Sequence, residues 1–202
     1  ILKSIVVNNL YGVDIMEEAV EICKLRLFLK LVAQIERVKD MEPLPDIDFN
    51  IRSGNALVGF YSLEEIRRIA ERESSGQGKL LFGEADDAIR EIEDEADMVS
   101  RAFQKFHEMQ VTYNVDAESF VEAKKQVRNR LQILSSKLDV YLAREYAIDQ
   151  KRKGKKFDQW RSTHQPFHWL SEFYGIMRSG GFDVIIGNPP WKEYSKVKSY
   201  QV

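Results

Sequence analysis

Residues 180–191 read GGFDVIIGNPPW and join a short apolar run to the tetrapeptide Asn-Pro-Pro-Trp. The apolar run, residues 182–187, contains β-branched side chains and is bounded by glycines, which predicts a buried strand of an α/β sheet. The tetrapeptide, residues 188–191, follows at the carboxyl end of this strand. Open α/β sheets bind their ligands at that end, so the tetrapeptide is the first candidate for a catalytic site.

The candidate catalytic residues Asn188, Pro189, Pro190 and Trp191 offer what methylation of an exocyclic amine requires. The Asn188 amide oxygen and the Pro189 carbonyl oxygen are acceptors that the two prolines hold in a stiff backbone. Acceptors on the amine hydrogens favour a tetrahedral nitrogen, whose lone pair can attack a sulfonium methyl group in line. The Trp191 ring offers a face on which a planar base can stack. The alternative is a proline-rich turn after a strand, with Trp191 in the core.

The N-terminal part of the chain predicts further pieces of an α/β core. Residues 1–9 have the pattern of a helix end, and residues 10–15 (LYGVDI) that of a buried strand. Residues 16–39 contain no Gly or Pro and carry apolar side chains on much of their circumference, which predicts a helix largely buried against a sheet. Residues 48–52 predict a second short strand, and the turn Ser-Gly-Asn at 53–55 follows it.

Residues 61–163 are polar, charged and helical in pattern, and they predict an insertion into this core. Two apolar series recur at intervals of three and four residues, the spacing of helices that pack along a seam. The seam residues are Ile89, Ile92, Ala96, Val99, Phe103 and Phe106, and then Val127, Leu131, Leu134, Leu138 and Tyr141. Acids dominate residues 84–97, whereas the second series is accompanied by Lys124, Lys125, Arg128, Arg130 and Lys137. We therefore expect an antiparallel helical hairpin in which opposite charges pair.

Two shorter features lie between the hairpin and the apolar run. Residues 151–156 (KRKGKK) predict a basic loop, and residues 164–178 predict a helix rich in aromatic side chains. The loop could contact phosphates, but a solvated loop explains the same residues equally well.

Composition excludes few functions. The 202 residues suffice for one α/β domain with an insertion, and the net charge of −2 neither favours nor excludes a nucleic-acid partner. The single cysteine, Cys23, excludes an internal disulfide framework and a cysteine-based zinc cluster, and its place in a helix predicts a small core residue. The sequence shows neither a signal peptide nor a membrane-spanning run of about 20 apolar residues. The start without methionine and the abrupt end suggest a piece of a longer protein.

Three segments resemble, in chain order, the second, third and fourth motifs of adenine-N6-specific DNA methyltransferases. They are YGVDI at residues 11–15, SGNAL at 53–57 and the run at 182–191. The likeness is closest to the large type IIG restriction–modification enzymes and related phage-defence methyltransferases. The phrase FHWLSEF at 167–173 also resembles theirs. The resemblance does not extend to the long insertion.

The resemblance implies S-adenosylmethionine (SAM) as the cofactor. It implies that Asp14 accepts hydrogen bonds from the ribose hydroxyls of SAM and that Asn55 faces its adenine ring. Ile15 and Ala56 would be walls of the same pocket. The family usually has Asp in place of Asn55, and the amide keeps an acceptor but lacks the charge.

The fold that the resemblance implies is a partial Rossmann-like methyltransferase core of the α/β class. Residues 1–60 and 164–202 would be its two parts, and residues 61–163 the helical insertion. No segment of the chain matches the first motif of the family, a strand with a glycine-rich turn that wraps the methionine end of SAM. The family places that strand between those ending at Asp14 and Asn188. We therefore expect that this chain alone methylates nothing detectably.

The expected substrate is double-stranded DNA. Because adenine N6 is inaccessible inside a duplex, the base would be flipped out and stacked on Trp191. The basic residues Lys151, Arg152, Lys153, Lys155 and Lys156 are weaker candidates for contacts with DNA phosphates. The other expected partners are flanking domains of the same polypeptide, with no membrane, in the cytoplasm of a bacterium or archaeon.

Two other interpretations remain open. Asn-Pro-Pro-aromatic motifs also occur in enzymes that methylate guanine amines in RNA or glutamine amides in proteins. Alternatively, the helices of residues 84–148 could form a non-catalytic interaction module beside a degenerate core, although seam residues are more often core than binding surface.

Overall fold

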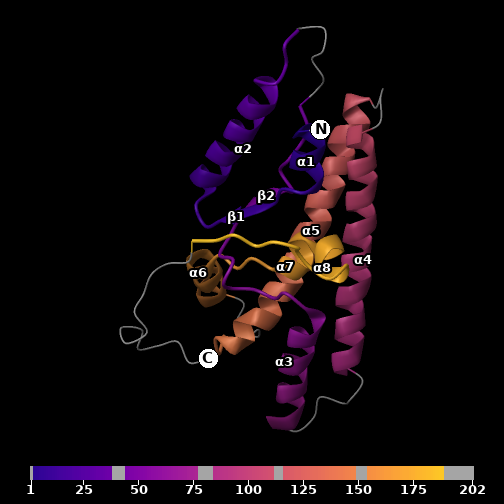
Figure 1. The fold of residues 1–202 in the computed structure, drawn as a ribbon. Coiled ribbons are helices and arrows are strands. Elements are labelled where there is room, and N and C mark those ends of the chain that lie inside the picture. The colour runs from indigo at the N-terminus through magenta and orange to yellow at the C-terminus, as the bar shows by residue number, and fades with distance from the viewer. Residues whose placement is uncertain (1, 38–43, 77–83, 112–115, 149–153, 189–202) are drawn as a thin grey trace.

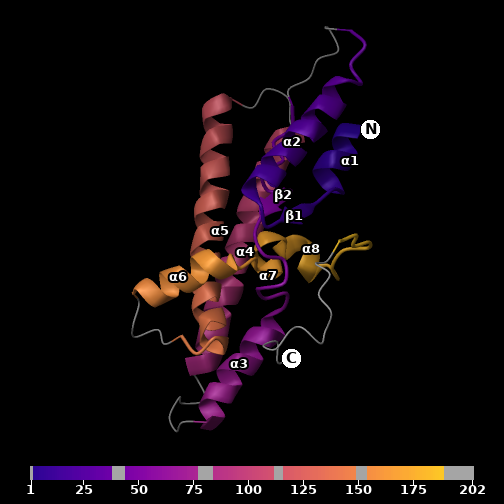
Figure 2. The ribbon, with the colours of Figure 1, turned by 90° about the vertical axis from the view of Figure 1, so that its left-hand side faces the viewer.

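The computed structural model describes residues 2–37, 44–76, 84–111, 116–148 and 154–188. Helices dominate, and a small sheet lies among them (Figure 1). In chain order the elements are α1 (Leu2–Asn8), β1 (Gly12–Asp14), α2 (Glu17–Val32), β2 (Ile51–Ser53), α3 (Leu63–Gly76), α4 (Glu84–Val111), α5 (Ala117–Glu145), α6 (Lys155–His164), α7 (Trp169–Glu172) and α8 (Tyr174–Arg178). The long helices α4 and α5 lie side by side, with the sheet, α1 and α2 beside one half of this pair and α3 beside the other (Figures 1 and 2).

The two strands form a parallel pair that α2 connects. In the observed register Gly12 lies opposite Ile51 and Asp14 opposite Ser53. Parallel strands require such a crossover, and α2 packs on the sheet through Val20, which shares a buried cluster with Ile51. Both predicted strands are therefore present: β1 is shorter than the predicted residues 10–15, and β2 begins later than the predicted residues 48–52 and includes Ser53, which was predicted to begin the turn. The prediction that β1 is buried is wrong, since Asp14 is exposed and its neighbours in the strand are only partly covered.

Helix α2 is less buried than its composition predicts. Of its apolar side chains, Val20 and Leu31 are buried, whereas others are more than two-fifths exposed. The exposed ones are Ile22, Leu25, Leu29 and Val32. Cys23 is exposed as well, so its prediction as a core residue is wrong. The reason is geometric: one face of α2 rests on the sheet and α1, and no described element covers the opposite face.

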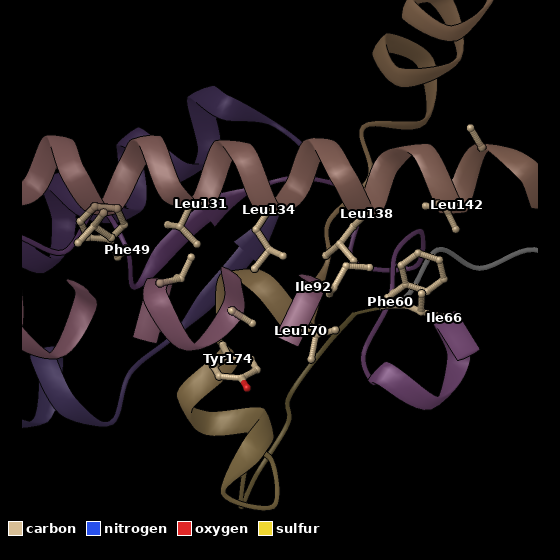
Figure 3. Close-up of a cluster of buried hydrophobic side chains, with 14 of the residues drawn as sticks. Phe49, Phe60, Ile66, Ile92, Leu131, Leu134, Leu138, Leu142, Leu170 and Tyr174 are labelled. Carbon is tan, nitrogen blue, oxygen red and sulfur yellow. The ribbon is translucent and has the colours of Figure 1, made fainter. Parts of the chain in front are cut away.

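Helices α4 and α5 carry the main hydrophobic core, and most of the predicted seam is buried in it. Of the seam positions, only Phe103 and Tyr141 are partly exposed. Figure 3 shows Leu131, Leu134 and Leu138 projecting in a row from α5 into this core. Burial of one such leucine contributes roughly 1.5–3 kcal/mol to stability.

Contacts between α4 and α5 run in opposite sequence order. The Lys137 ammonium lies 2.6 Å from Glu91, and the rings of Phe106 and Phe120 lie 5.0 Å apart. A position late in α4 therefore meets one early in α5.

The charge pairing differs in part from the prediction. Lys137 and Arg130 do pair with acids of α4, but Lys124 and Arg128 pair with Asp48 in the loop before β2. Lys24 of α2 also binds Asp48, at 2.9 Å. Burial alone would raise the pKa of Asp48, but hydrogen bonds from Lys124 and Lys24 outweigh it and lower that pKa to about 2. The Asp48 carboxylate thus connects the loop before β2 with α2 and α5.

The segment predicted as one aromatic helix, residues 164–178, is broken. Helix α6 ends at His164, and Gln165 adopts a left-handed conformation with φ of 45°. Pro166 follows, and a residue before proline is disfavoured in the helical region. The helices α7 and α8 then form separately. Lys155 and Lys156 lie in the first turn of α6 rather than in a loop.

The predicted strand at residues 182–187 is not observed as a strand. Its apolar side chains Val184, Ile185 and Ile186 are 73%, 75% and 92% exposed, so the prediction of burial is wrong. A strand needs a neighbour about 4.8 Å away for its ladder of hydrogen bonds, and no described strand pairs with this segment.

Candidate functional site

The carboxyl ends of β1 and β2 bring together the residues predicted to bind a cofactor. Asp14 ends β1, and its carbonyl oxygen accepts a hydrogen bond of 2.9 Å from the Gly54 amide, directly before Asn55. The Asp14 carboxylate is exposed and accepts one hydrogen bond, from the Met16 amide at 2.9 Å. A carboxylate has further acceptor positions, so the side chain can still take hydroxyl donors.

Asn55 is held by its backbone and by a local turn. Its amide donates to the Gln165 carbonyl at 2.7 Å, and its side-chain oxygen accepts from the Leu57 amide at 3.1 Å. The neighbouring Ala56 is exposed, and Ile15 beyond β1 is 50% exposed. Parallel pairing therefore places the four predicted cofactor residues at one edge of the sheet. Their contact with a cofactor stays a prediction.

Residues 165–170 run beside the loop that contains Asn55. The amides of Phe167 and Leu170 donate to the carbonyls of Val58 and Phe60, at 2.7 and 3.0 Å. The indole nitrogen of Trp169 donates to the Ala56 carbonyl at 2.9 Å. The segment FHWLSEF, singled out in the sequence without a role, is thus bonded to the loop that follows β2.

Gly59 makes this close approach possible. It has a φ of 152°, and a β-carbon at this position would lie 2.0 Å from the carbonyl oxygen of Phe167. Only glycine avoids both the strain and the clash. Sequence reasoning missed this residue, and the only available signal was a second glycine five positions after Gly54.

A buried polar pair lies beneath the same loop. His168 is 2% exposed; its Nδ1 accepts from the Phe60 amide at 3.2 Å, and its Nε2 lies 3.1 Å from Asp139 of α5. Because Nδ1 accepts the hydrogen bond of the Phe60 amide, the arrangement corresponds to the tautomer in which Nε2 carries the hydrogen and donates it to Asp139. Arg161 of α6 pairs with the second oxygen of Asp139 at 2.8 Å. Sequence reasoning missed this pair because its members are 29 positions apart.

An aromatic cluster connects β1 with the start of residues 182–188. The Tyr11 ring lies 5.3 Å from Phe173 and 5.7 Å from Phe182, in edge-to-face geometry. Trp169 lies 5.9 Å from Phe182 on another side. Burial raises the pKa of the Tyr11 hydroxyl. The cluster holds Phe182, six positions before Asn188, against the first strand.

The structure describes only part of the predicted catalytic tetrapeptide. Asn188 is exposed, and Pro189, Pro190 and Trp191 lie outside the described residues, so the joint geometry of the four stays a prediction.

Among the predicted DNA-contacting residues, Lys155 and Lys156 are exposed on α6, while Lys151, Arg152 and Lys153 lie outside the described part of the chain. Their contact with phosphates stays a prediction. Within the described residues, no three His, Cys, Asp or Glu side chains are grouped so as to hold a metal ion, and none of the helices could cross a membrane.

Comparison with known proteins places the chain in a family. The family model described as Eco57I restriction-modification methylase matches residues 8–201, almost the whole chain. The chain belongs to the Eco57I restriction-modification methylase family. The likeness to restriction–modification methyltransferases that the three motifs predicted is therefore confirmed. The family match also includes the insertion, which the motifs left unassigned.

A relative of this Eco57I-family chain is known from Methanocaldococcus jannaschii. It carries the name "Putative type II restriction enzyme and methyltransferase" and is 32% identical over 223 residues, which cover 93% of this chain. The aligned region is 18% of the length of that protein, so the chain spans less than a fifth of its relative. No solved structure matches the chain.

Proposed function

We propose that this chain is part of an enzyme that transfers a methyl group from SAM to the N6 amine of adenine in DNA. One observation carries the proposal. The parallel pairing of β1 and β2 brings Asp14 and Asn55, the residues of the second and third motifs, to the carboxyl edge of one sheet. Ligands of open α/β sheets bind at that edge.

The described residues fit the nucleoside end of SAM. The Asp14 carboxylate is exposed and keeps free acceptor positions, as binding of two neighbouring ribose hydroxyls requires. The Asn55 side-chain oxygen is engaged by the Leu57 amide, which leaves the NH₂ group to face an acceptor of a purine ring. When bound, SAM supplies the electrophilic methyl group.

The catalytic role in this proposal belongs to residues 188–191. The Asn188 side-chain oxygen and the Pro189 carbonyl accept hydrogen bonds from the adenine amine and so make its lone pair available, and Trp191 stacks on the flipped base. Positioning and oriented dipoles then provide the catalysis, without a protein nucleophile. Double-stranded DNA is accordingly the proposed substrate.

The proposal includes an architecture. The sheet with α1 and α2 would belong to a Rossmann-like core formed by residues 1–60 and 164–202, and α4 with α5 would be the helical hairpin of an insertion at 61–163. Because no segment of the chain matches the glycine-rich first motif, we expect the 202-residue chain alone to bind SAM weakly and to methylate nothing detectably. Tight binding in a calorimetric titration of this chain with SAM would contradict that expectation.

The full-length enzyme tests the proposed chemistry. Asn188→Ala should abolish adenine methylation in an expressing host while leaving the dissociation constant for SAM within about twofold, because this side chain acts on the target amine. Asp14→Ala should instead weaken SAM binding, and Asp158→Ala, an exposed carboxylate on α6, is the matched control. Methylation-sensitive sequencing reports the first effect and calorimetry the second. Adenine marks that survive Asn188→Ala would refute the catalytic assignment, and methylation of RNA or protein instead of DNA would refute the substrate.

A further inference from the structure

The segment at residues 165–173 contacts every motif segment of the proposed site, yet the proposed chemistry assigns it no role. Its backbone binds the loop after β2 through the amides of Phe167 and Leu170, and Gln165 accepts from the amide of Asn55. Trp169 adds the side-chain hydrogen bond to Ala56. The loop at residues 55–60 is therefore hydrogen-bonded to this segment at four of its six positions.

The same segment also reaches the other two motif segments through its rings. Phe173 packs edge-to-face against Tyr11, directly before β1, with ring centres 5.3 Å apart. Phe173 and Trp169 both contact Phe182, at 5.4 and 5.9 Å, where the chain leads towards Asn188. Segments far apart in sequence are thus held by one set of aromatic contacts.

On its inner side the segment is anchored to the long helices. His168 receives the Phe60 amide and donates to Asp139, a carboxylate of α5 that is 3% exposed. Leu170 belongs to the same buried cluster as Leu138 of α5 (Figure 3). Arg161 pairs with one oxygen of Asp139, and His168 is the partner of the other, so loss of His168 would leave a buried carboxylate oxygen without its donor.

We propose that residues 165–173 position the loop at 55–60 for cofactor binding, with Trp169 and His168 as positioning residues, and that α5 thereby supports the affinity for SAM. This inference rests on the proposed function. Trp169 acts on the loop directly through the Ala56 carbonyl. His168 acts indirectly, because its ring bonds both to the Phe60 amide in the loop and to Asp139 of α5, and so fixes the loop relative to that helix.

Trp169→Phe in the full-length enzyme is the sharpest test, because it removes the indole N–H and keeps an aromatic ring. The expected result is a rise of about threefold to tenfold in both the dissociation constant and the KM for SAM, the size expected from one lost hydrogen bond. The kcat at saturating SAM should change less than twofold. Amide hydrogen exchange of residues 53–61, measured by mass spectrometry without SAM, should become faster.

Trp160→Phe is the matched control. Trp160 is buried, whereas Trp169 is only partly buried. The indole nitrogen of Trp160 has no hydrogen-bond partner among the described residues, so this variant loses ring volume without losing such a bond. It should leave SAM binding and exchange in residues 53–61 unchanged, even if thermal stability falls.

A second pair of variants separates the two contacts of His168. His168→Asn keeps an acceptor near Phe60 but cannot reach Asp139, and His168→Gln keeps a donor for Asp139 but loses the acceptor. Both should raise the KM for SAM, because each breaks the connection between α5 and the loop.

Distinct outcomes separate this inference from the proposed function. Unchanged exchange in residues 53–61 of the Trp169 and His168 variants would overturn the inference, as would a loss of thermal stability with an unchanged KM for SAM. Failure of the wild-type full-length enzyme to bind SAM in calorimetry would overturn the proposed function itself. Faster exchange together with a raised KM for SAM supports both.

Discussion

Replacement of Asp48 by Asn should destabilise the protein in a strongly pH-dependent way. The Asp48 carboxylate binds Lys24 at 2.9 Å and Lys124 at 2.6 Å, with Arg128 at 3.3 Å. These cations come from α2 and α5, so the carboxylate holds together two helices that are remote in sequence. The variant keeps the shape of the side chain and removes only its charge.

The size of the expected destabilisation follows from the shift in the pKa of Asp48. The pKa of Asp48 falls from 3.8 to about 2 in the folded protein. At about 1.4 kcal/mol for each pKa unit, the shift corresponds to roughly 2.5 kcal/mol. The side chain is 32% exposed, so solvent screening reduces this contribution to about 1–2 kcal/mol.

The direction of the pKa shift determines the pH range in which Asp48 stabilises the folded protein. A carboxyl whose pKa is lowered by folding stabilises the folded state above its unfolded pKa, and this stabilisation is lost as the pH falls through the folded value. The stability gap between wild type and Asp48→Asn should therefore be complete at pH 7 and above about pH 5. It should shrink to about half near pH 3 and nearly vanish near pH 2.

Urea unfolding followed by circular dichroism measures this gap across the pH range. The control is Asp183→Asn, which removes an exposed carboxylate and should change the free energy of unfolding by less than about 0.5 kcal/mol. High salt should narrow the Asp48 gap, because screening weakens partly exposed ion pairs. A gap below about 0.3 kcal/mol at pH 7, or one that persists unchanged into acid, would refute the assigned pairing.

Two further substitutions test the packing of the site and of the core. Gly59→Ala should lower the free energy of unfolding by about 3 kcal/mol or more, because its φ is positive and the added β-carbon would meet a backbone carbonyl. The control Gly175→Ala has open space around the added β-carbon and should be neutral or slightly stabilising. Thermal unfolding compares the two, and a Gly59 variant as stable as wild type would show that the segments are not in contact. Leu134→Ala should lower the free energy of unfolding by about 2–5 kcal/mol, because the side chain is fully buried. The control Ile133→Ala, at a half-exposed neighbour, should lower it by less than about 1 kcal/mol. Equal losses in chemical denaturation would contradict the burial of the seam.

Features that depend on local periodicity were predictable. The apolar intervals of three and four residues led to α4 and α5 because a helix places such positions on one face whatever lies opposite. The two short strands were recognisable from short segments with apolar side chains, the second of them directly before a Ser-Gly-Asn turn. The tetrapeptide at 188–191 was recognisable because its residue types carry the chemistry, and the segments at 11–15 and 53–57 were recognised by their resemblance to methyltransferase motifs.

Features that depend on a neighbour were not predictable. The apolar side chains Ile22 and Leu25 of α2 have the pattern of core residues and are exposed. The run around Ile185 has the composition of a buried strand and lies unpaired and exposed. Whether a side chain is buried, or a strand is paired, depends on a second segment that packs against it. The sequence of the first segment does not specify where that second segment lies.

For the candidate site the division is similar. The amino-acid sequence alone identified Asn188 from its side-chain chemistry, and the resemblance of two other segments to methyltransferase motifs identified Asp14 and Asn55. Only the tertiary structure showed that Asp14 and Asn55 share one sheet edge and that His168 connects this edge to Asp139. A hydrogen bond between residues far apart in the chain depends on how the intervening helices fold back, and that path results from packing of the whole core.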